Sequence, residues 1–159
     1  MEKQRVYVES SVISYLNPKL SKDPQKRIWQ LQTALWWERR HEWDCVVSAT
    51  VMDEIARGDS GAAAQRLEKA RSLVEVPVPP ETYFLADLLV SHKLVPESVR
   101  ADAVHLAAAA IHGAHYLLTW NQKHLANQKR SGRIEDLIRK FGWQPAKVVT
   151  PAELLEELR

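Results

Sequence analysis

The chain has 159 residues, of which 45% are hydrophobic and 26% are charged, and this composition suffices for the buried core of a single domain over residues 1–159. Its 22 Lys and Arg residues nearly balance its 20 Asp and Glu residues, so the formal net charge is only +2. This balance excludes recruitment of a polyanion by bulk charge, and any nucleic-acid site must be local.

The cysteine content and the N-terminal segment bear on the cellular compartment. The single cysteine, Cys45, stands in an apolar run and cannot form an internal disulfide, which fits a reducing environment. Residues 1–11 lack the apolar core of a signal peptide, and no apolar stretch approaches the ~18 residues that a membrane span requires. We therefore expect a cytoplasmic protein without a membrane partner.

The first half of the chain alternates short apolar runs with helical patterns. A strand is predicted at residues 6–8, followed by a short helix that ends at Asn17 and Pro18. A long helix then runs to about residue 41, with Ile28, Leu31 and Leu35 on one stripe. A strand at residues 45–47, helices over 49–56 and 62–72, and a β-prone run at 73–78 follow.

The second half continues the same alternation. Helices are predicted over residues 81–92 and 99–112, the second rich in alanine and ended by Gly113. A buried strand at 115–119, a polar helix over 125–140, a strand at 148–149 and a short amphipathic tail complete the chain. Because each connection between strands is long enough to hold a helix, we expect a three-layer α/β/α sandwich with a short, mostly parallel central sheet.

Polar residues at the ends of strands indicate where chemistry would occur. Glu9 and Asn121 each follow a predicted strand directly, and the carboxyl ends of parallel strands meet at one crevice. Glu54 and Asp102 lie in helices that can flank the same edge. A cluster of acids supplies the hard oxygen ligands that a divalent ion needs for phosphodiester cleavage. For Asp102, an exposed partner of Arg100 or His105 is an equally open interpretation.

Four stretches of the chain carry a family pattern: VYVESS at 6–11, VMDEI at 51–55, ADAVHLAAA at 101–109 and YLLTWNQKH at 116–124. In order and spacing they resemble a PIN domain of the VapC toxin type. The resemblance implies a ribonuclease dependent on Mg²⁺ or Mn²⁺ that cleaves RNA. It also implies a homodimer and a cognate antitoxin protein that occupies the site.

The resemblance also implies roles for individual acids. Glu9 takes the place of the first acid, which in the family is usually Asp, and Glu54 matches the helical glutamate because an aliphatic residue follows it. Asp53 is then a solvated helix charge. Asp102 matches the aspartate of the pattern Asp-Ala-x-His-x-Ala. Glu9, Glu54 and Asp102 are therefore the expected metal ligands and catalytic residues.

Asn121 stands where many relatives have a fourth acid, which lowers the negative charge available to a metal. Its amide oxygen can still bind a hard cation or a water, and we count it among the catalytic residues. Ser10 and Thr119 are expected to support the ligands from behind. The other interpretation of Asn121 is a turn residue or helix N-cap.

Several further residues are candidates for contact with RNA. Arg100 and Lys123 can contribute to a phosphate-binding rim, and Trp120 can stack on a base. The alternative for Arg100 and Lys123 is a solvated charged face, and the alternative for Trp120 is a place in the core. Trp29, Trp36 and Trp37 on the long helix are expected in the core and on a dimer or antitoxin face.

Four histidines that lie near one another in the sequence raise the question of zinc. They are His105, His112, His115 and His124. No matching His or Cys pair stands elsewhere in the chain, so structural or surface roles are expected.

The prediction from sequence is thus a metal-dependent endoribonuclease, the toxin of a type II toxin–antitoxin pair. The alternative is a PIN-like module whose catalysis is weakened by Glu9 and Asn121 and which binds RNA or protein.

Overall fold

The computed structural model describes residues 2–121, 125 and 128–158. In this part of the chain five strands form one sheet in which every pairing is parallel. The strands are β1 (Arg5–Val8), β2 (Asp44–Ser48), β3 (Val74–Val76), β4 (Tyr116–Leu118) and β5 (Lys147–Val149), and their order in the sheet is β3-β2-β1-β4-β5. The expectation of a largely parallel α/β sheet is confirmed.

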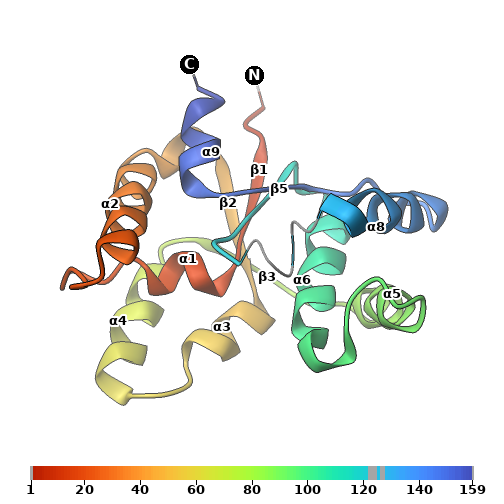
Figure 1. Ribbon diagram of the computed structural model, residues 1–159, viewed down its shortest axis with the longest axis horizontal. Helices are drawn as coiled ribbons and strands as arrows, with labels where there is room; N and C mark the ends of the chain where they lie inside the picture. Colours follow the sequence, from red (N-terminus) through yellow and green to blue (C-terminus); the bar gives the residue numbers. More distant parts are fainter. Residues whose placement is uncertain (1, 122–124, 126–127, 159) are drawn as a thin grey trace.

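Helices cover both faces of the sheet (Figure 1). One layer contains α1 (Ser10–Ser14), α2 (Pro24–Glu38), α3 (Ala49–Ile55), α4 (Ser60–Ala70) and α9 (Pro151–Glu156). The other contains α5 (Pro80–Ser91), α6 (Arg100–Ile111) and α8 (Gln128–Lys140). Short 3-10 helices at Arg40–Glu42 and Glu97–Val99 precede β2 and α6. Among the described residues, no helix is both long and apolar enough to cross a bilayer.

Side-chain caps fix where several helices begin. Asp23 accepts hydrogen bonds from the backbone N–H groups of Gln25 and Lys26, and Pro24 occupies the first turn of α2. The Ser48 hydroxyl accepts from the N–H of Val51 at the start of α3. Gly113 follows α6 with a φ of +67°, a conformation that glycine adopts without steric cost. Sequence signals therefore set the limits of these elements.

The order of the strands reverses between β1 and β4. The chain passes from β1 to β2 and β3 on one side, and returns to place β4 and β5 on the other side of β1. In parallel sheets with helices on both faces, ligand sites lie at the carboxyl ends of the strands on either side of such a reversal, here β1 and β4. There the N–H of Glu9 donates to the carbonyl of Leu118 at 3.0 Å. This pairing brings the residues after β1 and β4 side by side.

The core lies on both faces of the central strands and includes most of α6. Val6, Tyr7 and Val8 are all fully buried, as expected for a strand covered on both sides. Most of α6 is buried as well, and its alanines allow it to approach the sheet closely.

The long helix α2 packs on the rest of the protein through a face that does not include its predicted apolar stripe. Trp36 and Thr33 are fully buried. The apolar stripe, Ile28, Leu31 and Leu35, is instead 49%, 48% and 57% exposed. Because these apolar residues recur on one face of the helix and contact water, the stripe is a surface feature and not part of the core.

Two fully buried threonines give a test of this packing. Thr82 in α5 has no hydrogen-bond partner for its hydroxyl within the described part of the chain. Replacing it with valine removes an unsatisfied polar atom, so we expect Thr82→Val to leave the free energy of unfolding unchanged or to raise it by up to about 1 kcal/mol.

Thr33 is the matched control because its hydroxyl donates to the carbonyl of Trp29 and accepts from Trp120 Nε1. Thr33→Val should lower the free energy of unfolding by about 1–3 kcal/mol. Urea denaturation followed by circular dichroism measures both variants. Equal destabilisation of the two variants would contradict the contrast between a hydrogen-bonded Thr33 hydroxyl and an unsatisfied Thr82 hydroxyl.

Candidate active site

Glu9 lies at the carboxyl end of β1 and is only 6% exposed. Its Oε1 accepts hydrogen bonds from the hydroxyls of Ser11 and Thr119 at 2.5 and 2.6 Å, and its Oε2 accepts from Ser10 at 2.7 Å. These donors replace the water that a buried carboxylate loses. An oxygen of a carboxylate has two lone pairs, so Oε2 retains a direction in which it can bind a cation.

Glu54, on α3, lies beside Glu9 and contacts His105 of α6. The distance from Glu54 Oε1 to His105 Nε2 is 2.8 Å. Burial raises the pKa of the Glu54 carboxyl, but the hydrogen bond from His105, aided by Ser10 and Arg57, outweighs it and holds the pKa below its usual value. Glu54 is therefore an anion at neutral pH.

A chain of hydrogen bonds connects Glu54 to the core of the protein. Behind the imidazole, His105 Nδ1 lies 2.7 Å from the Tyr7 hydroxyl, which lies 2.7 Å from the Ser48 hydroxyl. Burial raises the pKa of Tyr7 far above its usual value, so its hydroxyl keeps its proton. The Glu54 carboxylate can only accept, and therefore His105 Nε2 holds a proton and donates it.

The Tyr7 hydroxyl lies between two polar atoms of the core. It carries one proton, and both His105 Nδ1 and the Ser48 oxygen lie 2.7 Å from its oxygen. The oxygen of Ser48 accepts in turn from the N–H of Val51. Each of the four side chains in this hydrogen-bonded series has a partner, and His105 orients the Glu54 carboxylate.

The donor atoms of Glu9, Glu54 and His105 lie within 4.8 Å of one another. Two ligand atoms that share one Mg²⁺ at about 2.1 Å each are at most about 4.2 Å apart, so small side-chain shifts suffice to hold an ion. Two carboxylates with oxygen lone pairs are hard donors, which fits Mg²⁺ or Mn²⁺. The residues present therefore fit a divalent ion.

Asp102 does not belong to that group of three among the described residues. It is 8% exposed on the first turn of α6, and its Oδ1 lies 3.5 Å from the Asn121 side-chain nitrogen. The interpretation of Asp102 as an exposed helix charge is wrong, because the residue is buried. Arg100 pairs with Asp87 instead.

Asn121 lies between Thr119 and Asp102. Its side chain contacts Asp102, while its backbone N–H donates to the Thr119 hydroxyl at 2.9 Å. Its carbonyl accepts from the N–H of Leu125 at 3.2 Å. The backbone of Asn121 is thus held at both ends, and its side chain is a neighbour of the acid.

The structure separates the remaining candidates. Ser10 and Thr119 contact Glu9 as expected, and Asp53 is exposed on α3. Trp120 is half-buried beside Ser11. The side chain of Arg100 is 40% exposed and is neutralised by Asp87. Lys123 lies outside the described residues.

Sequence reasoning missed two residues of the site. His105 was expected to have a structural or surface role, whereas it contacts Glu54 directly. Its position three residues after Asp102 on a buried alanine helix was the available signal, since residues three apart share a helix face. Ser11 bonds to Glu9 and accepts from the N–H of Trp120. No local pattern distinguishes its hydroxyl from that of Ser10.

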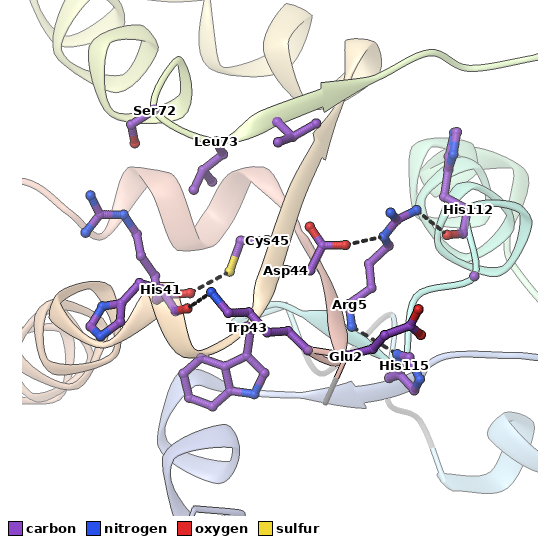
Figure 2. A pocket seen from close by; sticks show the side chains of 14 residues that line it. Glu2, Arg5, His41, Trp43, Asp44, Cys45, Ser72, Leu73, His112 and His115 are labelled. Atoms are coloured by element: carbon purple, nitrogen blue, oxygen red, sulfur yellow. Dashed lines mark hydrogen bonds and ion pairs between the residues drawn. The ribbon is translucent and has the colours of Figure 1, made fainter.

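A hollow of about 840 Å³ opens at the amino ends of the strands, at the opposite edge of the sheet from the acids (Figure 2). Arg5 crosses it, donating to Asp44 Oδ2 at 2.8 Å, to the carbonyl of His112 at 2.9 Å and, from its backbone, to His115 Nδ1 at 3.0 Å. Burial raises the pKa of the Cys45 thiol there to about 12, so it stays protonated. These groups hold the ends of β1, β2 and β4 together.

Comparison of the chain with models of known protein families gives no match, and comparison with curated proteins gives none either. Conclusions about function therefore depend on the geometry of the acids at the carboxyl edge of the sheet.

The buried hydrogen-bond chain gives a prediction about stability. Tyr7→Phe removes the hydroxyl between Ser48 and His105 and leaves both of their buried polar atoms short of a partner. We expect the free energy of unfolding to fall by about 1–3 kcal/mol. Tyr83→Phe, at a side chain that is 43% exposed, is the control and should change it by less than about 0.5 kcal/mol. Chemical denaturation measures the free energy of unfolding of both variants. A Tyr7 variant as stable as the control would show that the hydrogen bonds of Tyr7 to Ser48 and His105 are not formed.

Proposed function

We propose that this chain is a metal-dependent endoribonuclease, related to the PIN domains of VapC-type toxins. The observation that best supports the proposal is the meeting of Glu9 and Glu54, from distant segments, at the carboxyl edge of the sheet where the order of the strands reverses. Carboxylates at such an edge, with a third acid on α6, are a suitable donor set for a divalent ion, which can in turn bind an RNA phosphate.

In this proposal Glu9 and Glu54 bind Mg²⁺ or Mn²⁺, and His105 holds Glu54 in its orientation. Asp102 extends the acid set, and the Asn121 amide beside it can hydrogen-bond a water. The ion, when bound, supplies positive charge that stabilises the phosphate and lowers the pKa of a water. The attacking water forms a bond to phosphorus while one ester P–O bond of the RNA breaks.

The central experiment compares two adjacent acids on α3. Glu54→Gln removes a metal-binding charge while keeping the shape of the side chain, and Asp53→Asn makes the equivalent change at an exposed position. With labelled single-stranded RNA in Mn²⁺, we expect Glu54→Gln to lower the cleavage rate by roughly 100-fold or more. Asp53→Asn should cleave like the wild-type chain.

Two outcomes would overturn the proposal. One is full activity in both Glu54→Gln and Asp102→Asn, which would remove these acids from the site. The other is a wild-type chain that binds RNA and does not cleave it even in Mn²⁺. That second result would identify the chain as the weakened binding module.

We also propose that the chain is a homodimer and the toxin of a two-protein pair. The apolar stripe on α2, three large side chains about half exposed to water, supports contact with another protein. Light scattering should give twice the chain mass of 18.2 kDa. A mass of one chain at every concentration tested would contradict the dimer, and failure of the product of a neighbouring small gene to inhibit RNA cleavage would contradict the antitoxin.

A further inference from the structure

Three aromatic side chains from separate segments meet beside the acids, and we name Tyr15, Trp29 and Trp120 the aromatic cluster. The rings of Trp29 and Trp120 are stacked, with centroids 5.3 Å apart and planes 26° apart. Tyr15 contacts Trp29 at 5.8 Å and Trp120 at 6.1 Å, edge to face. The end of α1, the helix α2 and the residue two positions after β4 each supply one ring.

Hydrogen bonds fix the aromatic cluster in place next to Glu9. The backbone N–H of Trp120 donates to the Ser11 hydroxyl at 2.9 Å, and that hydroxyl donates to Glu9 Oε1. The indole Nε1 of Trp120 donates to the Thr33 hydroxyl at 2.8 Å, and this sets the orientation of the ring. One residue, Ser11, therefore separates the aromatic cluster from a metal-binding carboxylate.

Burial and charge distinguish the aromatic cluster from a core contact. All three of its side chains are half-buried, whereas Trp36 on the same helix is fully buried. Exposed cations lie at the start of α2, including Lys26, which is one turn before Trp29 on the same helix face. Asp23, the acid nearby, is used as the N-cap of α2.

We propose that the aromatic cluster is a stacking surface for one unpaired base of an RNA strand whose phosphate lies at Glu9 and Glu54. Aromatic rings beside basic side chains are the usual means of binding single-stranded nucleic acid, because every base has a π-face. A base within a duplex is already stacked on both sides, so the surface selects single-stranded RNA. This inference rests on the proposed ribonuclease function.

The test measures RNA binding in variants of Trp29. Trp29→Leu keeps an apolar side chain and loses the ring, Trp29→Phe keeps a ring, and Trp37→Leu changes another half-buried tryptophan of α2 as a control. The probe is a short, fluorescein-labelled, mixed-sequence single-stranded RNA, and its binding in Mn²⁺ is followed by stopped-flow fluorescence anisotropy before cleavage products accumulate. Thermal melting of each variant checks that it is folded.

We expect Trp29→Leu to weaken binding by roughly 5-fold to 100-fold, which is the usual effect of losing one stacked base. Trp29→Phe should keep most of the affinity, and Trp37→Leu should match the wild type. Equal affinity of Trp29→Leu and Trp37→Leu would overturn the proposal. For the wild-type protein, RNAs made abasic at one position at a time should lose affinity at one position near the cut, and a uniform small loss would also overturn it.

Cleavage assays separate this inference from the proposed function. If the wild type cleaves RNA in Mn²⁺ and Trp29→Leu cleaves with an unchanged KM, the stacking surface is wrong and the ribonuclease stands. If the wild type binds RNA through Trp29 and cleaves none, the ribonuclease is wrong and the stacking surface stands.

Discussion

Burial of the Glu9 carboxylate requires hydrogen-bond donors, and the carboxyl edge of the sheet is organised around that requirement. The hydroxyls of Ser10, Ser11 and Thr119 point their protons at it from two segments of the chain. Two of these hydroxyls also accept from backbone N–H groups of the loop after β4, those of Trp120 and Asn121. The position of that loop, and with it the neighbours of the acids proposed to bind metal, therefore depends on one buried carboxylate.

A second network extends from the site into the core. The imidazole of His105 connects Glu54 at the carboxyl edge of the sheet to Tyr7 inside β1 and, through Tyr7, to Ser48 at the end of β2. A buried network of this kind is favourable when each member is satisfied and costly when one is removed. The orientation of Glu54 is thus coupled to the packing of two central strands, and this coupling fixes the geometry of a carboxylate that is proposed to bind metal.

The two edges of the sheet have different roles for a physical reason. At the amino edge, Arg5 donates to Asp44 and to the backbone of the turn before β4, so the polar groups there satisfy one another. At the carboxyl edge, Glu9 Oε2 accepts one hydrogen bond from the described residues, that of Ser10, and a carboxylate oxygen can accept a further partner. An open set of negative donors attracts a cation, whereas a closed set stabilises the ends of strands.

The sequence by itself determined the sequence of strands and helices, the parallel sheet, and the position of Glu9 directly after a strand, because apolar periodicity and connection length are local properties. The tertiary structure alone decided that His105 contacts Glu54, that Asp102 lies against Asn121, and that Trp29 stacks on Trp120. These contacts depend on the order of the strands and on the rotation of each helix against the sheet. Both are set by the packing of the whole core, which no single stretch of the chain encodes.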